Sequence, residues 1–455
     1  MTLPSLAAFK AYDIRGKVPD ELNEDMAYKL GRVFTDQLQA KRVVLGYDIR
    51  LESEGLAAAL TRGLTEAGAE VLSLGLCGTE EVYFNTADLN ADGGIMVTAS
   101  HNPKGYNGMK LVSKGAKPIS RDSGLARFAE RILADDLGDA AAQPGLVTPY
   151  LSKDRYIKHL MSYVNLASLK PLKVVMDCGN GAAGAVIRDI AAHLPFECVF
   201  VNDTPDGHFP NGVPNPLLPT MREITAAAVR EHNADLGIAW DGDFDRCFLF
   251  DETGEFVEGY YLVGLLAKTL LAKQPGAKII YDPRLTWNTI DQVMDAGGVP
   301  IQSKTGHAFI KERMRLEDAL YGGEMSAHHY FKDFFYCDSG MIPWLLITQL
   351  MSVSGQPLSA LVAERVAAYP CSGELNYKVA DVAAVLARVQ AHFAALNPVH
   401  DDTDGLGLDF GHWRLNIRAS NTEPLLRLNV ESKGDRDWVW QKVAELEKLI
   451  RSLET

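Results

Sequence analysis

The chain has 455 residues, of which 47% are hydrophobic and 23% are charged, and it carries a net charge of −14 at pH 7. This length exceeds what one core ordinarily holds and predicts three or four domains, and the composition is typical of a soluble globular protein. The acidic balance excludes a general nucleic-acid surface, so an anionic ligand must be held by a local cluster of Arg and Lys side chains.

The N-terminal residues lack the basic region and the long apolar core of a signal peptide. No apolar run reaches transmembrane length, because Lys268 interrupts the best candidate, which begins after Tyr260. The six cysteines are scattered without C-x-x-C spacing, which predicts buried thiols in a reducing compartment. We therefore expect a cytoplasmic protein with no membrane and no nucleic-acid partner, and we expect it to be a monomer.

In chain order, one pattern occurs three times: an apolar strand that ends in Asp, a turn, a stretch with helical periodicity, and a second strand. The first strands lie at 43–48, 173–177 and 278–282, the second strands at 70–74, 197–201 and 299–303, and related third stretches at 91–100, 234–243 and 318–327. This alternation predicts three consecutive α/β domains with mixed, mostly parallel sheets. Ligands of such sheets gather at the carboxyl ends of the strands, so we expect the loops of the third stretches to share one central cleft.

The pattern changes after about residue 366. A helical stretch at 381–396, alternating strands at 413–418 and 425–431, and an amphipathic helix at roughly 437–453 predict a smaller C-terminal α+β domain. The predicted division is domain I at 1–147, domain II at 148–250, domain III at 251–366 and domain IV at 367–455.

Asp241, Asp243 and Asp245 alternate with small or apolar residues and are followed at once by Arg246, between two stretches that are typical of strands. Such closely spaced like charges repel unless a cation lies among them, and all-oxygen ligands favour Mg²⁺ or Ca²⁺ over zinc. The spacing also fits the start of a calcium-binding EF-hand loop, with Glu252 in the twelfth position. That loop needs Gly at the position of Arg246 and helices on both sides, so Mg²⁺ is favoured. A solvated acidic turn without metal is the other alternative.

Ser100 follows the strand at 94–99 and precedes His101-Asn102-Pro103. The G-x-S-x-G pattern of a hydrolase nucleophile is absent here, and a serine at a strand end, taken alone, more often shapes a turn. Beside Mg²⁺, however, a phosphate on Ser100 would give the metal a further oxygen ligand and would act as a transferable group. For His101, ordering of the loop is the simplest role.

Basic residues near Gly-rich or strand-end loops together predict a clamp for phosphate groups, although each alone is more typical of a surface charge. They are Arg15, Lys110, Arg246, Arg284, His307 and Arg418. The segment from Arg418 to Pro424 lies between two strands and adds two hydroxyls, an amide and turn N–H groups. It fits an anion-binding loop, with an ordinary hairpin turn as the alternative.

A competing signal lies at 174–184, where a G-x-G-x-x-G pattern from Gly179 to Gly184 follows a strand, and Asp203 ends the next strand. This arrangement is typical of dinucleotide-binding proteins, so an NAD(P)-dependent oxidoreductase is the alternative function. That alternative leaves the three aspartates and the Ser100 loop unexplained, and the glycines also suit close strand–helix packing. No G-x-x-x-x-G-K-[ST] segment is present, which argues against a nucleotide kinase of that class.

Four motifs occur in the order and at the distances of the α-D-phosphohexomutase family, which this chain resembles over nearly its whole length. They are Thr98-Ala-Ser-His-Asn-Pro103, Asp241-Gly-Asp-Phe-Asp-Arg246, Gly323-Glu-Met-Ser326 and Arg418-Ala-Ser-Asn-Thr-Glu-Pro424. Further stretches at 9–16, 210–219 and 321–330 resemble bacterial phosphomannomutases that serve exopolysaccharide and lipopolysaccharide synthesis, some of which also act as phosphoglucomutases.

The resemblance implies reversible conversion of mannose 6-phosphate and mannose 1-phosphate, with glucose phosphates also accepted. The reaction would pass through a phosphoserine enzyme and a hexose 1,6-bisphosphate, which also serves as activator. Arg246 and Lys110 would steady the transferring phosphoryl group. The implied ligands of one Mg²⁺ are Asp241, Asp243, Asp245 and the phosphate on Ser100. The implied substrate-binding residues are Tyr12, Arg15, Arg284, His307, Glu324, Ser326, His328, Arg418, Ser420, Asn421 and Thr422.

Many members of the family have Lys where this chain has Arg284. Arginine stays protonated at neutral pH and cannot exchange a proton with the substrate. If a general acid or base is needed near the sugar, His307 or His101 is the better candidate. Asn421 suits hexose mutases, because glucosamine relatives usually carry Gly at that place.

Overall fold

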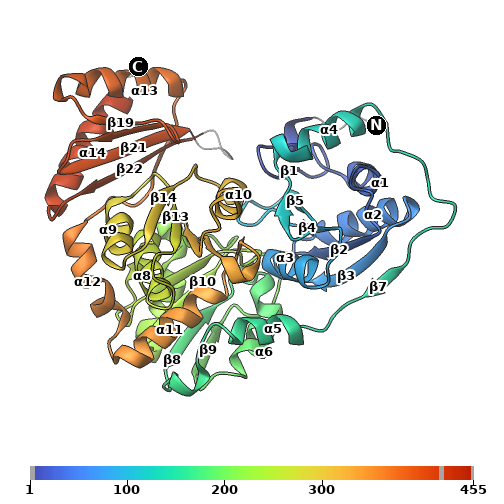
Figure 1. Cartoon of the computed structure of the whole chain (residues 1–455), viewed down its shortest axis with the longest axis horizontal. Coiled ribbons are helices and arrows are strands. Elements are labelled where there is room, and N and C mark those ends of the chain that lie inside the picture. Colours follow the sequence, from blue (N-terminus) through green and yellow to red (C-terminus); the bar gives the residue numbers. More distant parts are fainter. Residues whose placement is uncertain (1–5, 420–424, 452–455) are drawn as a thin grey trace. The chain divides into compact units, whose positions relative to one another are not determined.

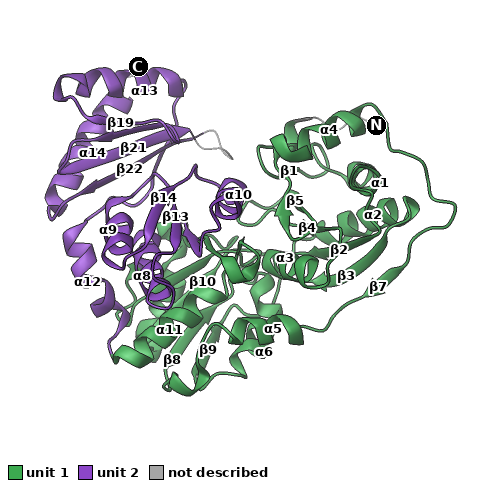
Figure 2. Cartoon of the chain, in the orientation of Figure 1, with its two compact units in different colours: residues 1–256, 328–355 green, residues 257–327, 356–455 purple. Residues whose placement is uncertain are grey.

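The computed structural model describes residues 6–419 and 425–451, so the predicted site residues Ser420, Asn421 and Thr422 lie outside the described residues. The chain divides into two compact units (Figure 2). Unit 1 comprises residues 1–256 and 328–355, and unit 2 comprises residues 257–327 and 356–455.

The first sheet of unit 1 has the strand order β1-β5-β4-β2-β3-β7, with β6 beside β5 (Figure 1). Its strands are β1 (Ile14–Lys17), β2 (Arg42–Tyr47), β3 (Glu70–Leu76), β4 (Gly93–Val97), β5 (Tyr106–Ser113), β6 (Lys117–Pro118) and β7 (Val147–Pro149). The α-helices are α1 (Glu24–Leu38), α2 (Ser53–Glu66), α3 (Thr79–Asp88) and α4 (Ala126–Leu133). β2 lies parallel to β3 and β4, whereas β5 is antiparallel to β1, β4 and β6. The sheet is therefore mixed.

Helices α1 and α2 pack closely because each carries a glycine at their contact. A Cβ on Gly31 would lie 2.5 Å from the carbonyl oxygen of Leu60, and one on Gly63 would lie 2.1 Å from that of Tyr28. Asn23 caps α1 by accepting a hydrogen bond from the first turn, which stabilises the helix by about 1 kcal/mol. The apolar residues of α1 lie in one buried core with those of α2 and β2.

The second sheet of unit 1 has the order β12-β11-β10-β8-β9, and unit 2 begins within β12. Its strands are β8 (Lys173–Asp177), β9 (Glu197–Val201), β10 (Leu236–Trp240), β11 (Cys247–Phe250) and β12 (Phe256–Val257), and its helices are α5 (Asp154–Met161), α6 (Ile187–Ala191) and α7 (Glu223–His232). β8 lies parallel to β9 and β10, and β10 is antiparallel to β11. The turn between β10 and β11 therefore lies at the carboxyl end of β10.

Residues 328–355, which the sequence placed in domain III, belong to unit 1 and contain β16 (His329–Phe331), β17 (Cys337–Asp338) and α11 (Ile342–Ser354). Buried hydrogen bonds explain the assignment. Glu80 of α3 accepts from Ser339 Oγ at 2.8 Å and from the Gly340 N–H at 2.6 Å, and Trp240 Nε1 donates to the Gly340 carbonyl at 2.9 Å. Sequence periodicity cannot show such contacts between segments far apart in the chain.

Unit 2 contains an α/β part in which β13 lies parallel to both β14 and β15. Its elements are α8 (Gly259–Leu271), β13 (Lys278–Tyr281), α9 (Trp287–Asp295), β14 (Val299–Gln302), α10 (His307–Glu317), β15 (Tyr321–Gly323) and α12 (Leu358–Ala368). Eleven of the thirteen residues of α8 are buried, which agrees with its nearly continuous apolar sequence.

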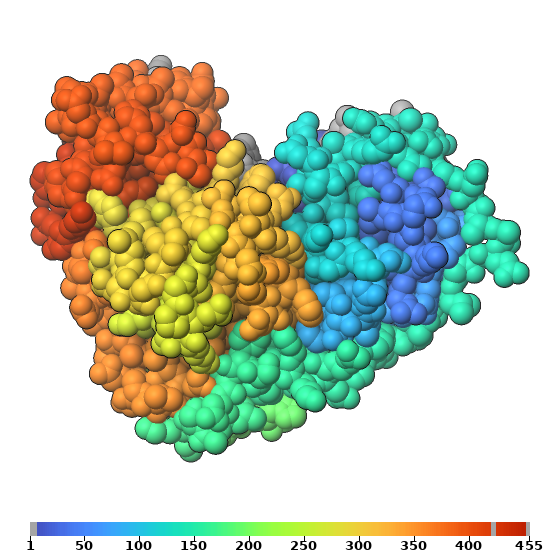
Figure 3. Space-filling model, in the orientation of Figure 1, coloured from blue at the N-terminus to red at the C-terminus, as the bar shows by residue number. Residues whose placement is uncertain are grey.

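The C-terminal part of unit 2 is an antiparallel sheet with the order β18-β22-β21-β20-β19, and its atoms gather in a lobe at the C-terminal, red end of the colour scale (Figure 3). Its elements are β18 (Leu375–Tyr377), α13 (Val382–Phe393), β19 (Val399–Asp401), β20 (Leu406–Asp409), β21 (Trp413–Ala419), β22 (Leu426–Ser432) and α14 (Arg436–Arg451). The two predicted strands and both predicted helices are confirmed. The three short strands β18, β19 and β20 were not predicted, because three or four residues are too few to show a period.

No single helix of residues 6–419 and 425–451 is long and apolar enough to cross a membrane. The helices Ile342–Ser354 and Leu358–Ala368 meet the length and composition criteria only when they are counted together across a bend.

His329 on β16 is fully buried, and burial lowers its pKa to about 3. In the unfolded chain the His329 imidazole takes up a proton with the ordinary pKa of about 6.5, whereas in the folded chain it stays neutral to a lower pH. We expect the contribution of His329 to the free energy of unfolding to be complete above about pH 6.5. Below that pH it should fall by about 1.4 kcal/mol for each pH unit. Urea unfolding at pH 7.5 and 4.5 measures the effect. The loss on acidification should be smaller by about 2–3 kcal/mol in His329→Gln than in the wild type, and equal losses would contradict this prediction.

Candidate active site

Ser100 lies just beyond β4, in a loop whose backbone is strained. Its φ is 49°, in the left-handed region that a residue other than glycine occupies at a cost of roughly 1–3 kcal/mol. The Ser100 hydroxyl donates to Asp241 Oδ2 at 2.6 Å and lies 3.1 Å from Nδ1 of His101. Gly242 permits this approach, because a Cβ there would lie 2.5 Å from the carbonyl oxygen of Ser100. The loop of Ser100 and the loop of the three aspartates therefore meet within unit 1.

Asp241, Asp243 and Asp245 lie in the turn between β10 and β11, and at most 1% of each is exposed. They offer one ligand atom each, and these atoms all lie within 4.8 Å of one another. The three Oδ1 atoms are buried and have no hydrogen-bond partner within the described part of the chain. Buried carboxylate oxygens without partners are costly, and a hard divalent cation would satisfy them. The residues present therefore fit Mg²⁺, and the flanking strands exclude the EF-hand alternative.

Lys110, on β5, is a buried cation between two of these aspartates. Its ammonium donates to Asp243 Oδ2 at 2.8 Å and also to Asp245 Oδ2. Burial favours the neutral form of Asp243, but the charge of Lys110 outweighs burial and lowers the pKa of Asp243 below its ordinary value. Burial, together with the charge of Asp243, raises the pKa of Asp245 to about 6. The lysine thus stands where it can neutralise both carboxylates.

Arg246 connects the aspartates to the serine. Its Nε donates to Asp241 Oδ2 at 2.9 Å, and its Nη2 donates to Ser100 Oγ at 3.2 Å and contacts Nδ1 of His101. A guanidinium in this position can donate to the oxygens of a phosphate on Ser100. Two predicted catalytic residues, His101 and Arg246, and one predicted metal ligand, Asp241, therefore contact the Ser100 hydroxyl.

Thr79, the first residue of α3, is a contact that the sequence did not reveal. Its hydroxyl donates to Asp243 Oδ2, and its backbone N–H donates to the carbonyl of Asp243 at 3.1 Å. The two residues are 164 positions apart, and no motif marks Thr79. Only the packing of α3 against the loop identifies it as part of the site.

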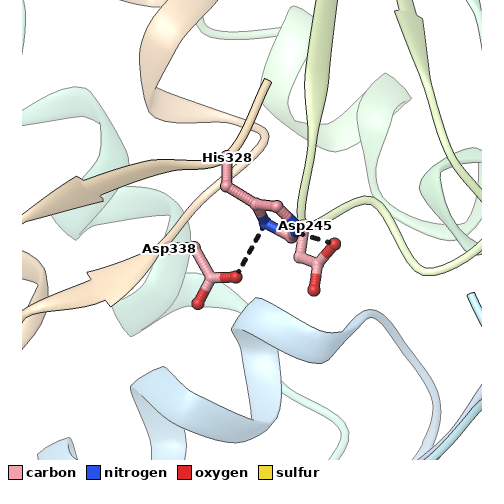
Figure 4. A group of neighbouring side chains, drawn as sticks. All are labelled: Asp245, His328 and Asp338. Carbon is pink, nitrogen blue, oxygen red and sulfur yellow. Dashed lines mark ion pairs between the residues drawn. The ribbon is translucent and has the colours of Figure 1, made fainter. Parts of the chain in front are cut away.

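His328 lies between two carboxylates, those of Asp245 and Asp338 (Figure 4). Its Nδ1 is 3.1 Å from Asp338 Oδ2 and 3.8 Å from Asp245 Oδ1. Burial alone would lower the pKa of His328, but the two carboxylates outweigh it and raise this pKa above its ordinary value. The sequence predicted a substrate-binding role for His328. The structure places this residue beside the turn at 241–246 that carries the three aspartates, called the metal loop below. Asp338, on β17, is a further residue that the sequence did not indicate.

Arg15, on β1, contacts the loop of Ser100. It donates to Asp13 Oδ2 at 2.6 Å and to Asn102 Oδ1 at 2.7 Å. Its Nε is buried and has no hydrogen-bond partner among the described residues. Tyr12 is half-buried and precedes this strand, which begins at Ile14. An arginine with one free donor beside the Ser100 loop suits the predicted contact with a phosphate.

In unit 2, four of the predicted substrate-binding residues lie together, two predicted for sugar hydroxyls and two for a phosphate. Arg284, which follows β13, donates from Nη2 to Asp282 Oδ2 at 2.9 Å, to Ser326 Oγ at 3.1 Å and to Glu324 Oε1 at 3.3 Å. Glu324 also accepts at 2.9 Å from the backbone N–H that precedes His307, the first residue of α10. The carboxylate and hydroxyl are the side-chain types that bind sugar hydroxyls, and here a permanently charged arginine orients them.

Glu374 lies among three arginines of unit 2. Its Oε2 is 3.3 Å from Arg284 Nη1 and 3.4 Å from Arg418 Nη2, and its Oε1 is 3.5 Å from Arg427 Nη1. Burial opposes ionisation of Glu374, but the three positive charges outweigh it and lower its pKa. Arg284 also pairs with Asp282 and Glu324, and Arg418 Nε lies 3.8 Å from Asp404 Oδ2, so these carboxylates balance the three positive charges. The guanidinium groups still supply several donors of the kind that bind a phosphate group. Of this cluster, the sequence indicated Arg284 and Arg418 but neither Glu374 nor Arg427.

The glycines at 179–184 serve close packing of the backbone, which corrects the dinucleotide alternative. Cβ atoms at Gly179, Gly181 and Gly184 would lie 2.4, 3.0 and 1.9 Å from the nearest atoms of Pro214, Gly242 and Asp203. The α-helix that follows, α6, has only five residues, and the carboxylate of Asp203 is paired with Arg188 at 2.5 Å. The long phosphate-binding helix and the free acidic residue of a dinucleotide site are therefore missing from the described residues 174–203.

The chain matches four models of one family over most of its length. They are described as Phosphoglucomutase/phosphomannomutase alpha/beta/alpha domain I at residues 6–135, domain II at residues 154–254, domain III at residues 258–369, and the C-terminal domain at residues 374–449. Three α/β/α domains and a separate C-terminal domain confirm the predicted fold class.

Two curated relatives are similar along almost their whole length. The chain is 59% identical over 452 residues to the phosphohexose mutases of Xanthomonas campestris pv. campestris, covering 99% of this chain and 100% of the relative. It is 57% identical over 456 residues to the phosphomannomutase of Salmonella montevideo, covering 98% of this chain and 100% of the relative. The crystal structure of a phosphoglucomutase/phosphomannomutase family protein from Burkholderia thailandensis is similar with a TM-score of 0.88 and 29% identity, covering 99% of this chain and 98% of that one.

Proposed function

The chain belongs to the phosphoglucomutase/phosphomannomutase family, and on that premise we propose that it interconverts mannose 6-phosphate and mannose 1-phosphate. The enzyme is an isomerase, an intramolecular phosphotransferase. The observation that carries the mechanism is the contact of the Ser100 hydroxyl with Asp241 at 2.6 Å, beside three aspartates whose Oδ1 atoms have no hydrogen-bond partner among the described residues. The proposed substrate rests on the similarity to the phosphomannomutase of Salmonella montevideo.

In the proposed reaction, the phosphate on Ser100 passes to the free hydroxyl of a hexose phosphate. The bond between phosphorus and Ser100 Oγ breaks, a bond between phosphorus and the sugar oxygen forms, and the sugar hydroxyl releases its proton. A hexose 1,6-bisphosphate results, and its other phosphate returns to Ser100. The same bisphosphate, supplied from outside, phosphorylates Ser100 and so activates the enzyme. Alignment and neutralisation of charge dominate catalysis of such transfers.

Asp241, Asp243 and Asp245, with a phosphate oxygen on Ser100, are the proposed ligands of one Mg²⁺. When bound, the ion supplies positive charge to the phosphoryl oxygens. Arg246 donates to the same oxygens from the other side, because its Nη2 already lies 3.2 Å from Ser100 Oγ. Lys110, on β5, supplies a second side-chain cation beside Asp243 and Asp245.

The residues of unit 2 are proposed to hold the sugar phosphate. Glu324 and Ser326 bind sugar hydroxyls, and Arg284 orients both of them through the hydrogen bonds described above. Arg418, with Ser420, Asn421 and Thr422, is proposed to hold the phosphate that does not react. Arg284 and His307 are proposed to help, as are Tyr12 and Arg15, which belong to unit 1. His328, which belongs to unit 1, lies 3.8 Å from Asp245 Oδ1 of the metal loop and is also proposed to lie near the sugar.

Arg284 cannot exchange protons near neutral pH, so another group must accept the proton of the sugar hydroxyl. We assign this role to a histidine, with His101 and His307 as the candidates. His101 contacts Arg246 and lies 3.1 Å from Ser100 Oγ, which favours it over His307 for the transfer from Ser100.

The enzyme is further proposed to accept glucose phosphates, because mannose and glucose differ at C2, whereas the implied contacts of Glu324 and Ser326 are to other hydroxyls. We also propose that it acts in the cytoplasm as a monomer. The predicted domain boundaries after residues 147, 250 and 366 stay predictions.

Peptide mass spectrometry tests the reaction class directly. After incubation with Mg²⁺ and glucose 1,6-bisphosphate, we expect one phosphoryl group on the peptide that contains Ser100. Turnover of mannose 1-phosphate and glucose 1-phosphate, measured side by side, then establishes the substrate range. Folded protein with an unmodified Ser100 would contradict the proposed function.

A further inference from the structure

One buried side chain, that of Arg50, holds the backbone of the Ser100 loop. Its Nη2 donates to the carbonyl oxygens of Asn102 at 2.6 Å and Ser100 at 2.8 Å, and its Nη1 donates to those of Tyr106 at 3.0 Å and Pro103 at 3.1 Å. Arg50 is only 4% exposed. A residue that follows β2 therefore binds four carbonyl groups between Ser100 and Tyr106, three in the loop that follows β4 and one at the first residue of β5.

A second set of contacts fixes the other side of Ser100. The carboxylate of Asp48 accepts from Ser53 Oγ at 2.5 Å, from Thr98 Oγ1 at 2.7 Å and from the Arg50 N–H at 3.0 Å. Thr98 Oγ1 in turn accepts from the backbone N–H of Ser100 at 2.8 Å. Both backbone polar groups of Ser100 are thus held by side chains: the N–H by Thr98 and the carbonyl by Arg50.

Ser100 depends on this support because its backbone is in a conformation that a serine does not ordinarily keep. Its φ of 49° persists only when the surrounding structure holds it there. The direction of the Cα–Cβ bond, and with it the position of Oγ, follows from the backbone angles. Phosphoryl transfer requires that the reacting oxygen and phosphorus align closely, and a misplacement of about 1 Å can cost a factor of roughly 100 in rate.

We propose that Arg50 is a positioning residue for the phosphoryl transfer: it holds Ser100 in the left-handed conformation that directs Oγ at the metal loop. This inference rests on the proposed function, in which Ser100 carries the phosphate. Arg50 acts through the loop backbone, since its four hydrogen bonds to the loop all end on carbonyl groups. Lysine cannot replace it, because one ammonium nitrogen cannot present the planar fork of a guanidinium to four acceptors.

Two variants test the proposal, with a third as matched control. Arg50→Lys weakens the hold on the carbonyl side, and Thr98→Val removes the acceptor for the Ser100 N–H while keeping the shape of the side chain. Arg32→Lys is the control, because Arg32 is also buried in unit 1 and donates to a backbone carbonyl, that of Gly138 at 3.0 Å, outside the Ser100 loop. Thermal unfolding of each variant shows whether it is folded. If Arg50→Lys does not fold, Arg50→Gln, which keeps N–H donors on a shorter neutral side chain, takes its place.

We expect kcat of both loop variants to fall by about 30- to 100-fold while KM stays within about threefold of wild type, because ground-state binding is not affected. The control should keep wild-type kcat and KM. Wild-type kcat in folded loop variants would overturn the proposal, as would a change confined to KM.

Hydrogen exchange of the peptide that covers residues 99–106 gives a readout that does not depend on activity. We expect about tenfold faster exchange in Arg50→Lys and Thr98→Val and an unchanged rate in the control. Unchanged exchange in both loop variants would overturn the proposal. If the wild type itself acquires no phosphate on Ser100, the proposed function fails, and loop exchange alone then decides whether Arg50 holds Ser100.

Discussion

Ser100→Ala is expected to lose nearly all mutase activity, by about 1,000-fold or more, and to keep the wild-type fold. The substitution removes the oxygen that carries the phosphoryl group, and no other side chain can take its place. The hydroxyls of Thr98 and Thr79 both lie near, but they donate to the carboxylates of Asp48 and Asp243. Kinetic assays with added glucose 1,6-bisphosphate measure the loss, and thermal unfolding checks the fold.

Ser152→Ala is the matched control, because this serine also lies in unit 1, but its exposed hydroxyl donates only to Asp154, at 3.0 Å. It should keep wild-type activity. Activity of Ser100→Ala within about tenfold of the wild type would remove the phosphoserine from the mechanism. Alanine suits the left-handed conformation no better than serine does, so Ser100→Ala could be slightly less stable than the wild type. Such a loss of stability would not change what the activity of folded Ser100→Ala says about the phosphoserine.

The fold could be read from the sequence where apolar residues recur with a clear period. β2, β8 and β13 are continuous apolar runs, and α14 shows one apolar face, so their existence and type were predictable. The short strands were not predictable, and neither were the contacts of residues 328–355 with the rest of unit 1. That segment joins unit 1 through hydrogen bonds that Glu80 accepts and Trp240 donates, and these connect distant parts of the chain.

The site was predictable where its residues are adjacent in sequence. The loops of Ser100 and of Asp241 to Arg246 each concentrate several functional groups in a few positions, and the structure brings the two loops together. The supporting residues were not predictable, because each acts from another element. Thr79, Arg50 and Asp338 have no motif of their own, and their roles become visible only through the atoms that they contact.

Asp243→Asn is expected to abolish the response to Mg²⁺ and to lower kcat by about 100-fold or more. Lys110 keeps the carboxylate of Asp243 ionised, and its Oδ1 has no partner among the described residues, so it is available to a cation. The three aspartates with Lys110 and Arg246 carry one net negative charge, and the amide removes it. A neutral site attracts a divalent cation far less than a negative one, and the amide also offers one oxygen fewer.

The melting temperature measured with and without Mg²⁺ tests this without any assay of turnover, because a ligand that binds only the folded state raises the melting temperature. The wild type and the control Asp206→Asn, whose exposed carboxylate pairs with His208 at 2.9 Å, should both be stabilised by Mg²⁺, whereas Asp243→Asn should not. Ser100→Ala distinguishes metal binding by the three aspartates from phosphoryl transfer through Ser100. It keeps all three aspartates, so it should retain most of the stabilisation by Mg²⁺ although it is inactive. Stabilisation that is lost in Ser100→Ala but kept in Asp243→Asn would place the metal elsewhere and would contradict the assignment of the three aspartates.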